Sequence, residues 1–238
     1  MTAVDTTQET TRSARPPRLA TGLAGLTMTV AVMFSTAPEP EEGLSSGALR
    51  RFYESNLDAT GLAVLCAALG FAAFVCFVVG LRRLLVDAGA EEWSIDLMTV
   101  SGTLVAVWFW VSGAVGSVVL VMANDSGKLS EYDDQAIAHL DLFSRLSETF
   151  GDLAMAMVGL FVASVSYAAV RTRFMPRWIG HVGLVVAVGC AVSLLGAAWM
   201  NPVFTTGFFV GLFGFFLWTL MTAVALCVRA VRSRPRLS

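Results

Sequence analysis

The chain has 238 residues, of which 56% are hydrophobic and 14% are charged, and its formal net charge is −2 at pH 7. Soluble domains contain about 45–50% apolar and about 25% charged residues, so the composition excludes an ordinary soluble globular protein and indicates an integral membrane protein. A nucleic-acid-binding domain would carry a basic excess. We therefore expect the lipid bilayer as a partner, and no nucleic acid.

Residues 1–17 are rich in Thr, Gln, Ser and Pro and show no apolar periodicity, so we expect a disordered cytoplasmic tail. The first apolar run, 19–37, follows three arginines and ends in small residues, a pattern that also fits a cleaved signal peptide. However, Pro38 would hinder cleavage at that point, and the run is longer than a usual signal core. We predict that this segment is an uncleaved membrane helix.

Six apolar runs are long enough to cross about 30 Å of hydrocarbon, which takes roughly 20 helical residues each. The sequence therefore predicts an all-α fold, an integral membrane bundle of six transmembrane helices in one domain over residues 18–228, followed by a basic cytoplasmic tail, 229–238. The six predicted spans are 19–37, 59–81, 97–123, 150–170, 178–200 and 203–228.

Basic residues are distributed unevenly between the two sides of these spans. Twelve arginines lie on the side of the two tails, and only four basic residues lie on the other side. Because basic residues near span ends are retained in the cytoplasm, we expect both termini to be cytoplasmic. An even number of spans agrees with that orientation. We expect a multi-pass protein of the bacterial cell (inner) membrane.

The first extracytoplasmic loop predicts a short helix, which Ser45 or Ser46 can cap. Its apolar residues share one face, so we expect the helix to lie along the membrane surface with that face toward the bilayer. These residues are Leu49, Phe52, Tyr53 and Leu57.

In the second extracytoplasmic loop, Ser130 with Asp133 three residues later resembles a capping box. Apolar residues then recur at helical spacing from Tyr132 to Phe150. The sequence therefore predicts that the fourth span begins outside the bilayer as one continuous helix.

That helical extension carries the candidate outer-face polar site, formed by Asp141, Arg145, Glu148 and Asp152 at spacings of three and four. Asp141 and Arg145 can form an ion pair, while Glu148 and Asp152 place two carboxylates one turn apart. Such carboxylates can hold a cation, relay protons or act as an acid–base pair. The simpler interpretation is the wet face of a solvated helix, and we assign no catalytic residue.

Metal-binding or cofactor-binding residues are scarce. His139 and His181 fall at opposite sides of the membrane and cannot share one metal or haem, and the four cysteines lie within spans with no ligand spacing. We predict no metal and no cofactor. His181, about one turn into the membrane, is interpreted as a packing residue, with a pH switch as the alternative.

The stretch RTRFMPRWIG, Arg171 to Gly180, follows an apolar helix ending in Ser166 and Tyr167 and leads into a further glycine-bearing span. This pattern resembles the inner hairpin of a family of small six-span bacterial membrane proteins catalogued as domain of unknown function 4386. The likeness is strongest over about 151–196. The resemblance implies a topology and no catalytic residue.

Small residues and tryptophans in the spans suggest packing and ligand surfaces. Gly207, Gly211 and Gly214, and Gly113 with Gly116, are predicted to be close helix contacts. The third span also carries Trp108 and Trp110, which can line a pocket for a lipid-like ligand or pack inside the bundle.

The sequence contains no Asp, Glu, Lys, Arg or His deep within a predicted span, which argues against ion-coupled transport. We expect a non-enzymatic scaffold, sensor or accessory subunit that acts with a membrane protein partner or as a homo-oligomer. The alternatives are a transporter or lipid-handling protein for an apolar substrate, and a membrane enzyme that uses the outer-face carboxylate pair.

Overall fold

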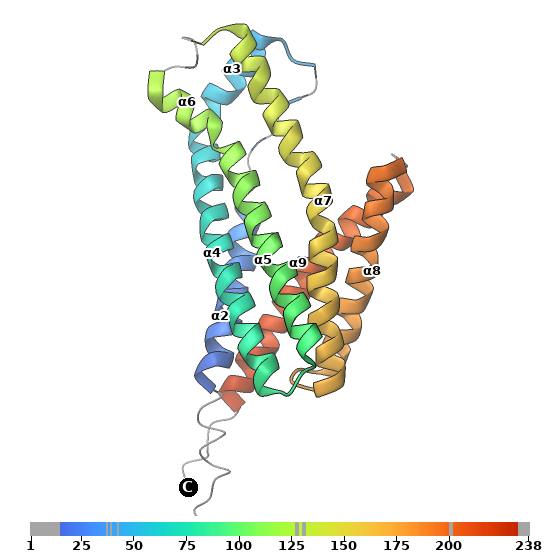
Figure 1. Ribbon diagram of the computed structural model, residues 1–238. Coiled ribbons are helices and arrows are strands. Elements are labelled where there is room, and N and C mark those ends of the chain that lie inside the picture. Colours follow the sequence, from blue (N-terminus) through green and yellow to red (C-terminus); the bar gives the residue numbers. More distant parts are fainter. Residues whose placement is uncertain are drawn as a thin grey trace, which may run out of the picture.

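The computed structural model describes residues 15–232, except 37, 39, 42, 127–128, 130–131 and 200–201; within the helices, the side chains of 15–16, 112, 115–116, 123–126, 138, 140–141, 143–153, 195–199, 202–206 and 208 are also not described. Every regular element in the described part is a helix (Figure 1). In chain order these are α2 (Arg15–Met33), α3 (Ser46–Ser55), α4 (Leu57–Asp87), α5 (Glu92–Gly116), α6 (Val118–Ser126), α7 (Asp134–Thr172), α8 (Arg177–Trp199) and α9 (Pro202–Arg232).

Five of these helices are long and apolar enough to cross a membrane: α4, α5, α7, α8 and α9. Their composition indicates a multi-pass membrane protein. The first predicted span corresponds to α2, a helix of 19 residues that is not among these five. The third predicted span is not one continuous helix, because a turn at Ser117 separates α5 from α6.

Small side chains allow α2 to pack closely between α4 and α9. A Cβ added at Gly22 would lie 2.5 Å from Cys227 Sγ, and one added at Gly80 on α4 would collide with Thr21. The hydroxyl of Thr21 donates to the Pro17 carbonyl at 2.6 Å, so this buried polar group is satisfied within its own helix. Therefore α2 is a packed member of the bundle.

Aromatic side chains fill the centre of the bundle. The Phe161 ring on α7 lies edge-on to Phe74 of α4 and to Trp218 of α9, with centroid separations of 5.4 and 6.2 Å. All three side chains are fully buried. One and two turns before Trp218 on α9, Gly214 and Gly211 pack against Val186 and Cys190 of α8, which confirms their predicted role as close helix contacts.

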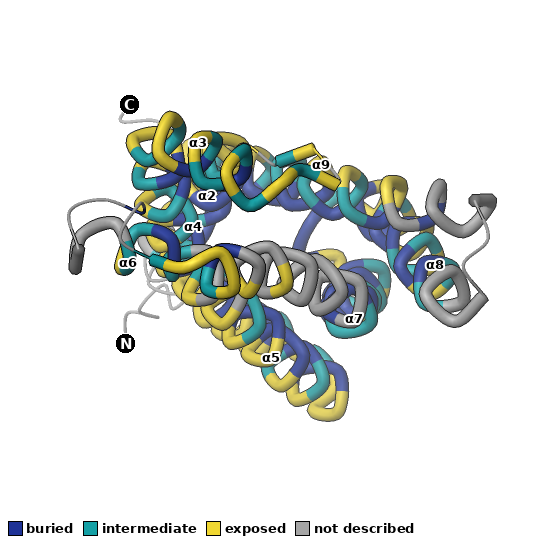
Figure 2. The backbone as a smooth tube through the Cα atoms, turned by 90° about the horizontal axis from the view of Figure 1, so that it is seen from above, coloured by how far each residue is buried: buried dark blue, intermediate teal, exposed yellow. Residues whose placement is uncertain are grey.

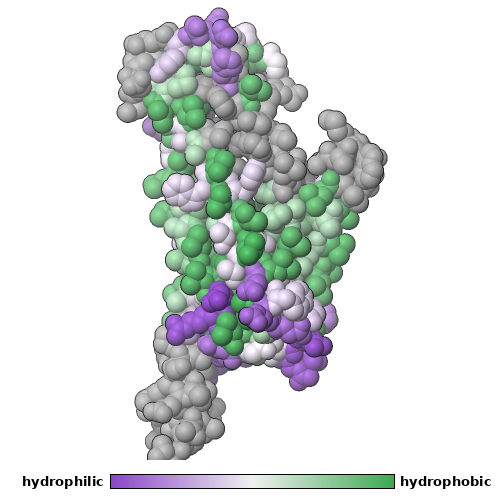
Figure 3. All heavy atoms as spheres, in the orientation of Figure 1, coloured by the Kyte–Doolittle hydropathy of each residue, from purple (hydrophilic) through white to green (hydrophobic). Residues whose placement is uncertain are grey.

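The two ends of the bundle differ in composition. The α4–α5 and α7–α8 connections lie at the same end as the start of α2 and the end of α9 (Figure 1). We call this the arginine end, and Figure 3 shows hydrophilic residues there, beneath a broad apolar band. Viewed from above, the buried positions of α5 face the other helices and its exposed positions face outward (Figure 2). The arginine end carries Arg18, Arg82, Arg83, Arg171, Arg173, Arg177, Arg229 and Arg232.

The opposite end carries a small cap, which consists of α3, α6, Leu129 and the first two turns of α7. Its separate hydrophobic cluster contains Leu49 and Tyr53 of α3, together with Val119, Leu129 and Ile137. The apolar face of α3 is therefore the predicted one, but Leu49 and Tyr53 are covered by α6, Leu129 and α7 of the same chain, and not by the bilayer as expected.

The start of α7 is fixed by Asp133, whose carboxylate accepts a hydrogen bond from the Ala136 backbone N–H at 2.7 Å. This carboxylate takes the role that the predicted capping box gave to Ser130, which lies outside the described residues. From there α7 continues for 39 residues, which confirms the prediction of one helix that begins in the cap and enters the bundle. Pro176 lies immediately before the first residue of α8.

Candidate functional site

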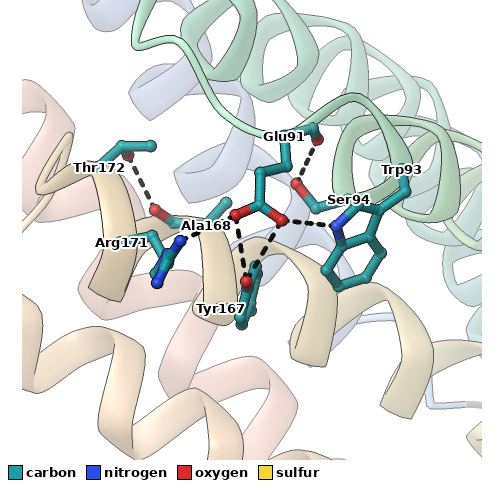
Figure 4. Close-up of polar contacts among 7 residues, drawn as sticks. All are labelled: Glu91, Trp93, Ser94, Tyr167, Ala168, Arg171 and Thr172. Atoms are coloured by element: carbon teal, nitrogen blue, oxygen red, sulfur yellow. Dashed lines mark hydrogen bonds and ion pairs between the residues drawn. The ribbon is translucent and has the colours of Figure 1, made fainter.

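At the arginine end, a carboxylate on the α4–α5 loop connects to α7 (Figure 4). Trp93 Nε1 donates to Glu91 Oε2 at 2.6 Å, the Tyr167 hydroxyl lies 3.2 and 3.3 Å from the two carboxylate oxygens, and Arg171 Nη2 lies 3.2 Å from Oε1. We call these four residues the Glu91 clamp. It joins the start of α5 to the last turns of α7, two segments that are 76 to 80 residues apart in sequence.

Local geometry explains why Glu91 faces α7. The chain leaves α4 through Gly89, whose φ of 67° favours glycine. The Glu91 carbonyl then accepts hydrogen bonds from the backbone N–H and the hydroxyl of Ser94, at 3.0 and 2.7 Å, which fixes the start of α5. Tyr167 and Arg171 are one turn apart on α7, so both reach the same carboxylate.

These contacts shift the pKa of Glu91 below its ordinary value. The hydrogen bond from Trp93 is the largest influence, partial burial opposes it, and the hydrogen bond from Tyr167 and the positive charge of Arg171 lower the pKa further. The carboxylate side chain is 41% exposed and that of Arg171 is 65% exposed. Water and salt therefore screen the clamp, and its energetic contribution is modest.

The α7–α8 hairpin is held at the same end by the last turn of α9. Arg173 ends α7 in the left-handed conformation, with φ of 58°, and its N–H donates to the Ala169 carbonyl at 3.0 Å. Phe174 and Met175 are buried beneath the hairpin. Arg229 of α9 donates to the Phe174 carbonyl, so the final helix is tied to this turn.

A second feature is a groove of about 530 Å³ between α4 and α5. Its walls are almost entirely apolar, and it is open to the side of the bundle, since Val79, Val107 and Trp110 in its walls are all more than half exposed. The single charged residue in its lining is Arg82, at the arginine end. Of the two tryptophans suggested to line a pocket, Trp110 lies in the groove wall, at the lateral opening, and Trp108 is not part of the lining. The groove is lined by Val75, Val78, Val79, Arg82, Thr99, Gly102, Thr103, Ala106, Val107, Trp110, Val111 and Ala114.

The predicted outer-face polar site lies on α7. Its helix contains the backbone of Asp141, Arg145, Glu148 and Asp152, but their side chains lie outside the described residues, so the predicted ion pair and carboxylate pair stay predictions. His181 is exposed on α8, and both interpretations of it, a packing residue or a pH switch, stay predictions.

The described residues contain no cluster of three or more His, Cys, Asp or Glu side chains placed to hold a metal. The four cysteines are free thiols, and Cys190 is buried where α8 meets Gly159 and Gly211. The expectation of no metal and no cofactor stays a prediction.

Sequence reasoning missed Glu91 and Trp93. A partial signal was present, because the segment 88–92 is short and contains two glutamates, and the hairpin that the arginine distribution places at the same end contains Arg171. The pairing itself depends on which helices are neighbours, and the sequence pattern did not specify that.

A family model described as Domain of unknown function (DUF4386) matches residues 20–223. The chain belongs to this family. The DUF4386 match covers nearly the whole described bundle, from α2 to α9, and so extends well beyond the hairpin on which the resemblance was strongest. No curated protein and no solved structure matches the chain.

Proposed function

We propose that this DUF4386 protein is a non-enzymatic sensor or scaffold of the bacterial inner membrane, with six spans and both termini in the cytoplasm. The observation that supports this proposal is the continuity of α7. Its 39 residues extend over about 58 Å at 1.5 Å per residue. One rigid element therefore contacts the cap at one end and the Glu91 clamp at the other.

The contacts at the cap end of α7 are specific enough to position it. Arg50 of α3 donates to the Tyr132 carbonyl at 2.7 Å and lies 3.3 Å from the Asp134 carboxylate. Ile137, one turn into α7, is fully buried in the cap cluster. A ligand or partner that moves α3 would therefore displace the first turn of α7.

The contacts of α7 at the arginine end would change if the helix moved. Tyr167 and Arg171 lie on the last two turns of α7, and their partner Glu91 is on the short α4–α5 loop. A small shift or rotation of α7 would change these distances, because Tyr167 and Arg171 are polar side chains that are at least partly exposed, whereas residues 154–169 of α7 are held largely by buried apolar side chains. In this proposal the short loops at the arginine end are the surface that a cytoplasmic partner detects.

Two observations support six spans with cytoplasmic termini. The close packing of α2 against Gly80 and Cys227 makes it a structural part of the bundle, and eight described arginines lie at the end where α2 begins and α9 ends. Single cysteines introduced into a variant without the four natural ones test the orientation. Ala90→Cys should react with a membrane-impermeant maleimide only after the cells are opened, while Ser45→Cys should react in intact spheroplasts. The reverse pattern would refute the orientation.

The coupling through α7 is tested by hydrogen–deuterium exchange in detergent micelles or nanodiscs. Arg50→Gln removes the charged contact with α7, and we expect faster exchange both in the cap and in the amides of residues 88–94 and 170–176. Arg51→Gln is the matched control, because the neighbouring Arg51 is exposed and makes no hydrogen bond or ion pair with a described residue. If the effect of Arg50→Gln is confined to the cap, α7 does not couple the two ends.

The lateral groove favours a second candidate from the alternatives, lipid handling. It does not compete with the proposed sensor, because the groove lies between α4 and α5 and the sensing path follows α7.

A further inference from the structure

The groove between α4 and α5 has the dimensions of a site for a single hydrocarbon chain. Along α5 its lining extends from Thr99 to Ala114, a distance of about 22 Å at 1.5 Å per residue. A volume of about 530 Å³ over that length gives a mean cross-section of about 24 Å². A helix with its side chains, about 10 Å across, has a cross-section of roughly 80 Å². The enclosed space is therefore as narrow as a single hydrocarbon chain and much narrower than a helix with its side chains.

The chemistry of the groove is matched to an amphiphile with its charged group at the arginine end. The walls are made of Val, Ala, Gly, Thr and Trp side chains, and the hydroxyl of Thr103 is already satisfied by the Thr99 carbonyl at 2.8 Å. Arg82 is exposed at one end and makes no hydrogen bond or ion pair with any residue that the structure describes. An anionic group beside Arg82 would neutralise the guanidinium charge, which no described residue pairs with.

The position of the groove also determines where its occupant comes from. Both α4 and α5 are long and apolar enough to cross the membrane, and the groove is open on their outer side. Arg82 lies five residues before the end of α4, among the basic residues of the arginine end, so we expect it at the level of the lipid headgroups. Lipid molecules of that leaflet can therefore enter sideways, without leaving the membrane.

We propose that the α4–α5 groove binds one anionic phospholipid from the leaflet at the arginine end, with an acyl chain along Thr99 to Ala114 and the phosphate beside Arg82. The inference goes beyond the proposed sensor function and does not depend on it. Phospholipid binding is measured directly, so failure of one proposal leaves the other intact.

Native mass spectrometry of the full chain, released from detergent after incubation with equal amounts of phosphatidylglycerol and phosphatidylcholine, tests the headgroup. We expect one retained phosphatidylglycerol and a preference over phosphatidylcholine of about fivefold, which corresponds to one basic residue at the membrane surface. Arg82→Gln should abolish the preference. Arg83→Gln is the matched control, because Arg83 is adjacent and exposed but does not line the groove, and it should retain the preference. If both variants lost the preference for phosphatidylglycerol equally, the assignment of the phosphate to Arg82 would be overturned.

The acyl-chain half of the proposal is tested with phosphatidylglycerol that carries bromine atoms on its chains. Bromine quenches nearby tryptophan fluorescence, and Trp110, 65% exposed in the groove wall, should account for a saturable part of the quenching. Trp110→Phe should remove that part, while the remaining tryptophans report only gradual quenching. If wild type and Trp110→Phe give the same curve, the chain does not occupy the groove.

Filling the groove provides an independent check. Thr103→Phe places a ring in the groove and should reduce lipid retention at least fivefold, whereas Leu104→Phe, at the adjacent exposed position outside the groove, should not. Size-exclusion chromatography confirms that each variant is folded. Should Thr103→Phe instead dissociate a dimer of the chain and leave lipid retention unchanged, the occupant is a second copy and the proposal is wrong.

Discussion

Helix α5 packs differently against its two neighbours. Towards α7, its surface is closed, because Phe161 fills the space beside Gly102 and the Glu91 clamp holds the helix ends together. Towards α4, it makes contact where Gly102 meets Val78 and where the Phe71 and Phe109 rings stack at 5.1 Å, and the groove lies along the same side. Both flanks of α5 are apolar, so the difference comes from the size of the facing side chains.

This difference follows from the physics of packing in a bilayer. In water, burial of apolar surface would drive α4 and α5 to close over the groove. In a membrane, lipid chains are as apolar as the helix surface, so only van der Waals packing and specific contacts favour closure. Val75, Val79 and Ala106 are too small to fill the space between the two helices, and a lipid chain can fill it equally well.

The largest expected effect comes from opening the closed flank. Phe161→Ala removes a fully buried ring that contacts Phe74, Phe215 and Trp218, and we expect the free energy of unfolding in detergent to fall by about 3–5 kcal/mol. Val107→Ala, a truncation in the groove wall, should change it by no more than about 0.5 kcal/mol. Equal losses, measured by denaturant titration, would show that the two flanks are packed alike.

A smaller effect is expected at the position where both flanks meet. A Cβ added at Gly102 would lie 3.0 Å from Val78 and 3.0 Å from Phe161, so Gly102→Leu forces α5 away from at least one neighbour. Overpacking of this kind costs about 1–3 kcal/mol. Gly113 on the same helix is the control, since an added Cβ would meet only Phe71, at 3.6 Å, and Gly113→Ala should leave the thermal midpoint nearly unchanged.

Some parts of the fold could be predicted from the sequence and others could not. Runs of about 20 apolar residues predict membrane helices because the bilayer thickness fixes their length, and α4, α5, α7, α8 and α9 follow those runs. The turn at Ser117 could not be inferred, because the sequence contains no proline there and the apolar run continues through it. The apolar face of α3 was predicted correctly, but the surface that covers it was not, since an amphipathic helix satisfies its apolar face equally on protein or on lipid.

The site was harder to predict than the fold. Local spacing drew attention to Asp141, Arg145, Glu148 and Asp152, all within one helix. The Glu91 clamp instead joins residues 76 to 80 positions apart, and the groove forms between two helices through the absence of large side chains. Neither the clamp nor the groove produces a recognisable spacing of residues in the sequence. Both follow from which helices become neighbours, and helical periodicity does not determine that.

A still smaller effect is expected where the open flank makes its aromatic contact. Phe109→Ala removes the stack with Phe71, and the loss of this pairing should lower the free energy of unfolding by about 0.5–1.5 kcal/mol, in addition to the apolar contact that the partly buried ring no longer makes. It should also widen the groove and weaken retention of the bound phospholipid. Leu104→Ala, an exposed position on the same helix, is the control. An unchanged denaturation curve for Phe109→Ala would mean that α4 and α5 are not held together by this pair.

The smallest effect concerns the clamp on the closed flank, and it depends on pH. Because the contacts from Trp93, Tyr167 and Arg171 hold the pKa of Glu91 below its ordinary value, the stabilisation is present above the unfolded-state pKa and is lost as the pH falls through the lowered value. The difference in thermal midpoint between wild type and Glu91→Gln should therefore be constant above about pH 5 and disappear in more acidic solution.

The adjacent Glu92 supplies the control for that pH series. Its side chain is exposed and makes no hydrogen bond or ion pair with a described residue, so Glu92→Gln should give the same midpoint as wild type at every pH. High salt should reduce the Glu91→Gln difference, because both partners of the ion pair with Arg171 are partly exposed. A difference that persists at low pH would show that the amide side chain disturbs packing at the start of α5, and that the carboxylate charge does not hold α5 to α7.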